Sequence, residues 1–186
     1  MRFLFAIILL SVVAPFGAVQ ACEDLWFARN FIMDRAGYCF GSRLGQAVFD
    51  NSDCTSQQVR LDAADQATIT QIRRKEAEIG CHIDTNQSWL NLKDINFRKV
   101  LTSNPIPDDF GWGCLGWIGP ETPLYAGHQE PFHAIGRINP GDYVFFSHIG
   151  VSDWAYVTVS DPYSDAFKSA GWLYWPGKKS CTAEAG

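Results

Sequence analysis

Six cysteines constrain the fold of this chain more than any other feature: Cys22, Cys39, Cys54, Cys81, Cys114 and Cys181. The N-terminal segment before them has the pattern of a secretory signal peptide, so the cysteines are expected in an oxidising compartment, where an even set indicates disulfides. We expect each bridge to lie within one half of the chain, where chain ends meet. The expected pairs are Cys22 with Cys81, Cys39 with Cys54, and Cys114 with Cys181.

The first residues predict export. Arg2 precedes an apolar run that is too short to be a comfortable membrane span, and Val19 and Ala21 are small side chains of the kind that a signal peptidase accepts. We therefore predict that residues 1–21 are removed and that no transmembrane segment remains. A lipid anchor on Cys22 is the alternative, but Gln20 is unusual in a lipoprotein signal and lipidation would leave an odd number of cysteines. A periplasmic or secreted protein is favoured.

The first half of the chain has helical periodicity. From Asp24 the apolar residues follow the spacing of a helix that ends at Gly37, where a left-handed cap is needed. A second helix begins after Asp62, a good N-cap residue, and Gly80 ends it. Its expected buried face consists of Ile69, Ile72 and Ile79. Residues 22–85 are thus predicted as a helical unit too small to be stable without disulfides.

The second half of the chain has the sequence pattern of short β-strands. Alternating runs such as "DYVFFSHIG" and "DWAYVTVS" are separated by the turn sequences "NPGD" and "SDPYSD". Short strands joined by tight turns indicate a small barrel. The predicted fold class is therefore α+β, with a disulfide-stapled helical unit at residues 22–85, a linker at 86–105 and a small β-barrel at 106–186.

The helical half resembles the YARHG-type extracellular domains, more narrowly a subgroup of unknown function. The residues that carry the resemblance are Leu25, Trp26, Arg29, Asn30, Ile32, Arg35, Gly37, Tyr38 and Phe40, followed by Leu44 and Phe49. Of the five residues that name the family, only Arg35 and Gly37 are present. The resemblance implies an extracytoplasmic accessory module and transfers no catalytic residue.

The β half resembles bacterial SH3-like (SH3b) barrels. The matching segments are "TPLYAG", "FHAIGRINPGDYV", "DWAYVTV" and "GWLY". The chain departs from that pattern at Gly127–Glu130, where many such domains have Arg-x-Gly-Pro-Ser, and in the extra loop "DPYSDAFKSA". The resemblance implies binding of peptidoglycan or another ligand of the cell envelope.

Most polar residues have a structural interpretation. Arg29, Asn30 and Arg35 are expected to bind loop carbonyls or to pair with Glu76 or Glu78. The four histidines lack the spacing of a metal site, and disulfide-bonded cysteines do not hold zinc, so no metal or cofactor is predicted. The formal net charge of -5 argues against nucleic-acid binding.

Aromatic residues supply the predicted binding site, because the β half contains more rings than a small barrel core can bury. We expect Tyr125, Tyr163 and Trp172 to form a groove at one end of the barrel, with His128 and Glu130 as polar contacts. The predicted function is non-catalytic binding of peptidoglycan or of an envelope protein. The alternatives are a cell-wall hydrolase, or a secreted inhibitor that uses acidic charge to bind basic hydrolases.

Overall fold

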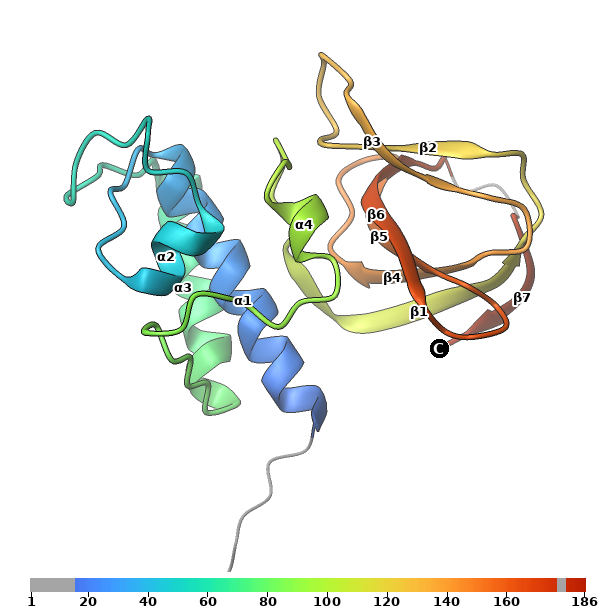
Figure 1. Cartoon of the computed structure of the whole chain (residues 1–186), viewed down its shortest axis with the longest axis horizontal. Coiled ribbons are helices and arrows are strands. Elements are labelled where there is room, and N and C mark those ends of the chain that lie inside the picture. The colour runs from blue at the N-terminus through green and yellow to red at the C-terminus, as the bar shows by residue number, and fades with distance from the viewer. Residues whose placement is uncertain (1–15, 177–179) are drawn as a thin grey trace, which may run out of the picture.

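The computed structural model describes residues 16–176 and 180–186. Within these ranges the helices come first: α1 (Phe16–Arg35), α2 (Arg43–Val48), α3 (Ala63–Glu78) and α4 (Ile95–Arg98). The strands are β1 (Pro107–Trp117), β2 (Thr122–Tyr125), β3 (Ala134–Ile138), β4 (Tyr143–His148), β5 (Trp154–Ser160), β6 (Phe167–Tyr174) and β7 (Cys181–Ala185). Helices and strands occupy opposite sides of the molecule (Figure 1). The α+β class is confirmed. None of the described helices is long and apolar enough to cross a membrane.

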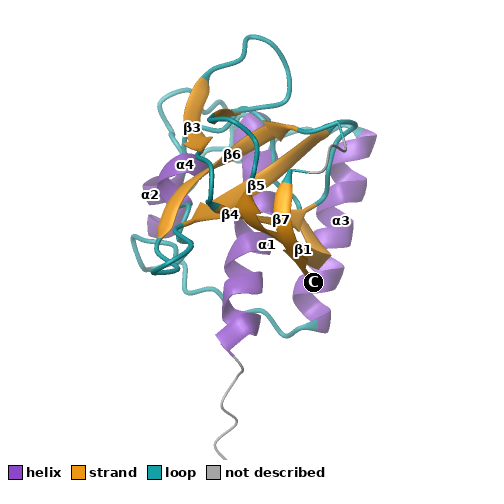
Figure 2. Ribbon diagram, turned by 90° about the vertical axis from the view of Figure 1, so that its right-hand side faces the viewer, coloured by secondary structure: helices purple, strands orange, loops and turns teal. Residues whose placement is uncertain are grey.

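The two long helices of the N-terminal half pack side by side (Figures 1 and 2). The backbone N–H of Asp65 donates to the Asp62 side chain at 2.8 Å, which caps α3 as predicted. Gly37 and Gly80 follow the ends of α1 and α3 with φ of +82° and +70°, a left-handed conformation that glycine adopts without strain. α1 begins at Phe16, within the predicted signal peptide, and residues 1–15 of that peptide lie outside the described residues.

Three disulfides staple the chain: Cys22–Cys81, Cys39–Cys54 and Cys114–Cys181. They are the pairs expected from the sequence. The first ties α1 to Cys81, two residues after the C-cap of α3, with Cα atoms 5.3 Å apart. The third ties β7 to its neighbour β1, with Cα atoms 5.2 Å apart. Each bridge thus fastens elements within one half.

The strands form an antiparallel sheet in the order β3-β2-β6-β5-β4-β1-β7. Among the described strands no pairing joins the edge strands β3 and β7, so the expected closed barrel is corrected to a curled, open sheet (Figure 1). β2 is only four residues long and pairs with β6 through Tyr125 and Trp172 alone, which weakens the ladder on that side. Inside the curl lies a hydrophobic cluster that includes Leu124, Val144, Val157 and Leu173.

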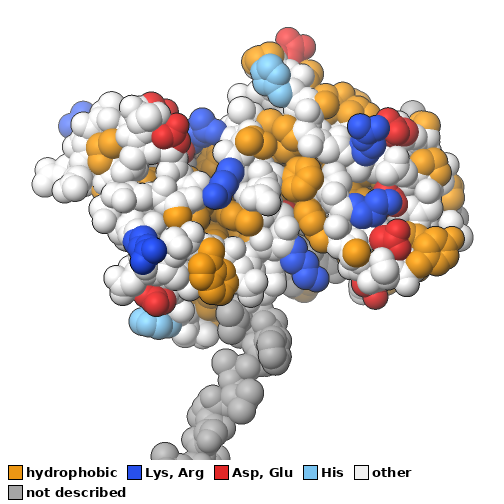
Figure 3. Space-filling model, in the orientation of Figure 1, with side chains coloured by type: hydrophobic (Ala, Val, Ile, Leu, Met, Phe, Trp, Pro, Cys, Tyr) orange, Lys and Arg blue, Asp and Glu red, His pale blue; other side chains and the backbone are white. Residues whose placement is uncertain are grey.

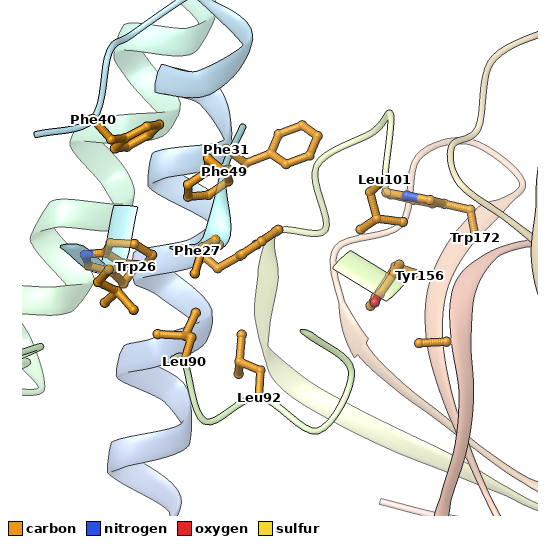
Figure 4. Close-up of a cluster of buried hydrophobic side chains, with 13 residues drawn as sticks. Trp26, Phe27, Phe31, Phe40, Phe49, Leu90, Leu92, Leu101, Tyr156 and Trp172 are labelled. Carbon is orange, nitrogen blue, oxygen red and sulfur yellow. The ribbon is translucent and has the colours of Figure 1, made fainter. Parts of the chain in front are cut away.

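A second hydrophobic cluster joins the two halves. It contains Trp26 and Phe27 of α1 together with Tyr156 of β5 and Trp172 of β6 (Figure 4). The segment 86–105, which was expected to be a linker, contributes Leu90, Leu92 and Leu101 to this cluster, and each of these side chains is buried. The helical half and the sheet therefore share a core, and the connecting segment forms its middle layer.

Candidate functional site

Four aromatic side chains form a connected group at the surface of the sheet, which we call the ring surface: Tyr125, Phe132, Trp154 and Tyr174. The Phe132 and Trp154 rings stack with centroids 5.2 Å apart, and the Trp154 and Tyr174 centroids are 5.3 Å apart. Phe132 is 43% exposed and Tyr174 is 53% exposed. The group thus presents apolar ring area to solvent while its members hold one another in place.

Strand alternation places these rings. Trp154 pairs with Tyr174, and two residues along each strand Tyr156 pairs with Trp172, so all four point from the outer face of the sheet. Tyr156 and Trp172 are fully buried beneath the helical half and the segment 86–105. That cover does not extend over Tyr174, and it leaves Trp154 only partly buried. The ring surface is therefore the uncovered continuation of an aromatic face.

The structure corrects the predicted place of Trp172. Its side chain has no exposed surface, and its Nε1 donates to the backbone carbonyl of Ser103 at 3.2 Å. The His128 ring meets it edge-on at 4.8 Å. Trp172 is therefore a core residue that anchors the segment 86–105 to the sheet, and it does not line a groove. The helical half covers this face, which is why a barrel considered alone suggests exposure.

Tyr163 also lies elsewhere. It is 96% exposed in the loop between β5 and β6, which is at the opposite end of β5 from Trp154. β5 is seven residues long, so its two ends are six residue steps apart, which is about 20 Å at the usual rise per residue. The expected convergence of Tyr125, Tyr163 and Trp172 is therefore wrong, and only Tyr125 belongs to the ring surface.

The predicted polar contacts lie in the hairpin between β2 and β3. His128 is half-buried against Trp172, and its backbone N–H donates to Ser103 Oγ at 3.2 Å. Glu130 is exposed in the same loop as Phe132. This hairpin projects from the molecule with histidine and acidic side chains near its tip (Figures 1 and 3). Glu130 is thus placed close in sequence to one ring of the surface, whereas His128 mainly supports the core.

Trp154 was not predicted to bind. The sequence feature that indicates its position is its spacing of two residues from Tyr156, because side chains at this spacing lie on the same face of a strand. That face becomes recognisable only when Tyr156 is known to be covered and Trp154 is not. Phe132 and Tyr174 belong to the same aromatic-rich half, and nothing in the sequence alone separates them from core residues such as Trp172.

A buried polar cluster links the two halves; we call it the junction cluster, formed by Asp24, Asp94, Arg98, His148 and Tyr156. Arg98 is 3% exposed and donates through Nη1 to Asp24 at 2.6 Å and through Nε to Asp94 at 2.8 Å. The Tyr156 hydroxyl donates to the same Asp94 oxygen at 2.8 Å. His148 Nε2 lies 3.1 Å from Arg98 Nη2 and 3.2 Å from Asp24 Oδ2. The cluster therefore crosses from α1 through α4 to β4 and β5.

Charge pairing explains how these groups tolerate burial. Burial alone would raise the pKa of Asp24, but Arg98 and then His148 outweigh it and hold the pKa well below its usual range. For Arg98, burial lowers the pKa and the carboxylates of Asp24 and Asp94 more than reverse this effect. The pKa of Tyr156 is raised well above its usual value, first by burial and further by Asp94. Asp24 is thus ionised and Tyr156 is a neutral donor at neutral pH.

Other polar predictions concern structure. Arg29 pairs with Glu76 of α3 at 3.1 Å, which confirms the expected pairing. Arg35 donates to the backbone carbonyl of Leu101, and the Asn30 side-chain amide donates to the Trp26 carbonyl at 2.8 Å. Within residues 16–176 and 180–186, no three or more His, Cys, Asp or Glu side chains are grouped as metal ligands would be.

These features define a class: a disulfide-stapled α+β protein in which a helical module and a curled sheet are joined by a buried polar cluster. Residues 80–186, more than half of the chain, match the family described as a domain of unknown function (DUF4453), and the chain belongs to this family. A YARHG domain matches residues 7–77. Comparison with curated proteins and with solved structures gave no match. The YARHG domain and the three disulfides indicate an extracellular or periplasmic location.

Proposed function

We propose that this protein binds a ligand of the cell envelope, most simply the glycan strands of peptidoglycan, through the ring surface and without catalysis. The observation that carries the proposal is the mutually packed group of Tyr125, Phe132, Trp154 and Tyr174, in which Phe132 and Tyr174 are exposed. Such rings offer flat apolar area to the C–H faces of sugars, and the tyrosine hydroxyls remain free to hydrogen-bond polar ligand groups.

The rigidity of the surface supports the same proposal. Trp154 contacts all three other rings of the surface, since its centroid lies 5.9 Å from Tyr125, 5.2 Å from Phe132 and 5.3 Å from Tyr174. Rings fixed by neighbours lose little conformational entropy when a ligand binds. An exposed apolar group held in this way is typical of interaction sites.

The fold of the C-terminal half and the disulfide at Cys22 support two further proposals. The curled antiparallel sheet supports an SH3-like relationship for the C-terminal half, a fold class whose bacterial members are often envelope binders. We propose further that the chain is exported through cleavage before Cys22 and carries no lipid, because the structure pairs Cys22 with Cys81.

The test is co-sedimentation of the oxidised mature chain with insoluble peptidoglycan. We expect the wild-type protein to be retained and the variants Phe132→Ala and Tyr174→Ala to lose most of this retention. Tyr163→Ala is the control, because it removes an exposed ring, 96% accessible, that lies outside the ring surface. Circular dichroism of each variant checks that folding is intact.

Three outcomes separate the alternatives. Equal retention of all variants would show that the ring surface is not the site. Absence of wild-type retention at low salt would remove the peptidoglycan ligand and leave an envelope protein as partner. Release of soluble cell-wall fragments during the incubation would indicate a hydrolase instead.

A further inference from the structure

A polar cavity is lined in part by the junction cluster and lies toward the end of β5 that is opposite Trp154 of the ring surface. Its volume is about 230 Å³, and its floor includes Asp24, Asp94, Arg98 and His148. Pockets that bury drug-sized ligands measure about 300–1,000 Å³, so this cavity suits one small ring. Gln20 also lines the cavity and would be lost on cleavage before Cys22, whereas the other lining residues would remain.

The walls of the cavity come from the outer face of β4 and β5. Along β5, Trp154 and Tyr156 are followed on the same face by Thr158 and Ser160, and the last two line the cavity. Ser147 of β4 contributes a third hydroxyl. One strand face therefore passes from the ring surface, beneath the helical half, to this cavity. A hydroxyl both donates and accepts hydrogen bonds, so the walls suit a ligand that does the same.

The charges of the lining residues limit which class of ligand the cavity can bind. The lining contains three carboxylates, Asp24, Asp94 and Asp165, and two fixed cations, Lys93 and Arg98. Arg98 already donates to both Asp24 and Asp94, so it is not free to form a new ion pair with an anion. Since the carboxylates outnumber the fixed cations, an anionic ligand is disfavoured.

Aromatic side chains supply an apolar contribution. Phe145 and Phe167 also line the cavity, and both are half-buried. A sugar ring has hydroxyls around its edge and C–H groups on its faces, so it matches walls that combine hydroxyls, carboxylates and phenyl rings. An organic cation would use the carboxylates and the rings but would leave the hydroxyls of Ser147, Thr158 and Ser160 without a matched partner.

We propose that this cavity at the YARHG–DUF4453 boundary is a binding site for a neutral monosaccharide unit. The site is independent of the ring surface. Its groups come from α1, from α4 and the segment before it, from β4 and β5, and from the β5–β6 loop with the first residue of β6. Asp24 is the contribution of the YARHG part that remains after cleavage before Cys22, so the complete lining requires both matched domains.

The energetics of the junction cluster agree with a binding role. A buried ion pair is often no more stabilising than apolar residues of the same size, so stability alone does not explain five polar groups at a domain boundary. In a binding site the same groups contribute to ligand recognition, because they fix the orientation of the side chains that face the ligand.

The experiment is a two-dimensional amide NMR titration of the full mature chain with three probes: methyl β-glucopyranoside, tetramethylammonium and inorganic phosphate. We expect the glucoside alone to shift the signals of Ser147, Thr158 and Ser160, with a Kd in the millimolar range that is usual for one small ring. Thr158→Val should weaken binding about threefold to tenfold, because it removes one hydroxyl and keeps the shape. Ser160→Phe should abolish binding by filling the cavity.

Tyr174→Ala is the control, and the glucoside affinity of the cavity, read from the signals of Ser147, Thr158 and Ser160, should equal that of the wild type. This variant separates the cavity from the ring surface, so failure of either proposal does not affect the other. The inference is overturned if the glucoside shifts none of these signals up to about 50 mM, above the millimolar Kd expected. It is also overturned if Thr158→Val and Ser160→Phe bind like the wild type, or if tetramethylammonium or phosphate shifts these signals and the glucoside does not.

Discussion

Nη1 of Arg98 lies 2.6 Å from Oδ1 of Asp24, and both side chains are largely withdrawn from solvent. Asp24 belongs to α1, in the part of the chain matched by the YARHG domain, and Arg98 ends α4, in the part matched by DUF4453. Two regions recognised as separate domains are thus joined by a buried ion pair. Their relative position is fixed by charge as well as by the shared hydrophobic core.

Replacing Arg98 with Ala should lower the free energy of unfolding by about 3–5 kcal/mol, because Asp24 and Asp94 would remain buried without their cation. Urea denaturation followed by tryptophan fluorescence measures the loss. Arg74→Ala is the control, since Arg74 pairs with Glu78 at 3.7 Å on the exposed side of α3. Its expected cost is below about 0.5 kcal/mol. Equal losses in the two variants would contradict a stabilising role for the junction cluster.

Stability should depend on the ionisation of Asp24. Its pKa is lower in the folded protein than in the unfolded chain, so its ionised form contributes stability above the unfolded pKa of about 4. This contribution is lost as the pH falls below that value toward the folded pKa. The difference in unfolding free energy between wild type and Asp24→Asn should therefore be largest near pH 7 and shrink at pH 3. A difference that stays constant over this range would exclude the linkage.

Trp172 and Tyr174 lie on the same face of β6 and should respond differently to truncation. Trp172→Ala empties a fully buried site and should cost about 3–5 kcal/mol. Tyr174 is 53% exposed, so Tyr174→Ala should cost far less. Thermal unfolding by circular dichroism compares the two. Similar melting temperatures would mean that the helical half does not cover this face in solution.

The sequence alone predicts what depends on local chemistry. Asp62 and Gly80 mark the ends of α3 because capping and left-handed backbone are local requirements. The pairing of Arg29 with Glu76 follows from helical faces that must pack. Which aromatic residues are buried and which are exposed could not be predicted from local chemistry. Whether Trp172 or Tyr174 is buried depends on where the segment 86–105 lies, and nothing local to β6 encodes that position.

The junction cluster was missed for the same reason. Asp24 and Arg98 are 74 positions apart, and neither belongs to a recognisable motif. The one hint is that "DLWFARN" combines a carboxylate and an arginine with large rings, a mixture that requires partners when it is buried. The partner of Asp24 came from the segment interpreted as a linker, which has no hydrophobic pattern strong enough to predict that it is packed.

Processing and disulfides can be checked on one sample. Intact-mass analysis of the exported protein should show an N-terminus at Cys22 and no lipid, because a thioether on Cys22 is incompatible with its bridge to Cys81. Peptide mapping without reduction should recover the three bridges within their own halves. Loss of the Cys39–Cys54 bridge by paired serine substitution should cost about 2–4 kcal/mol. A diacylglycerol mass on Cys22 would refute this processing.

The C-terminal half should not fold stably when it is expressed as residues 106–186. Tyr156, Ala170 and Trp172 are fully buried in the whole chain, and their cover is supplied by Leu101 and by the aromatic residues of α1 (Figure 4). The fragment would expose this apolar face to water, which costs about 25 cal/mol of folding free energy for each Å² uncovered. It would also lose the guanidinium of Arg98, which lies over the Tyr156 ring.

A longer fragment, residues 80–186, restores Leu90, Leu92, α4 and Leu101 and matches the DUF4453 boundaries. It still lacks Phe27 and Asp24 of α1, so Arg98 would lose one of its two carboxylates. We expect stability to increase from residues 106–186 to 80–186 to the whole chain, measured by amide hydrogen exchange and urea denaturation of the three oxidised proteins. If residues 106–186 alone exchange as slowly as the same residues in the whole chain, the sheet is an independent domain, and the shared core contributes nothing to its stability.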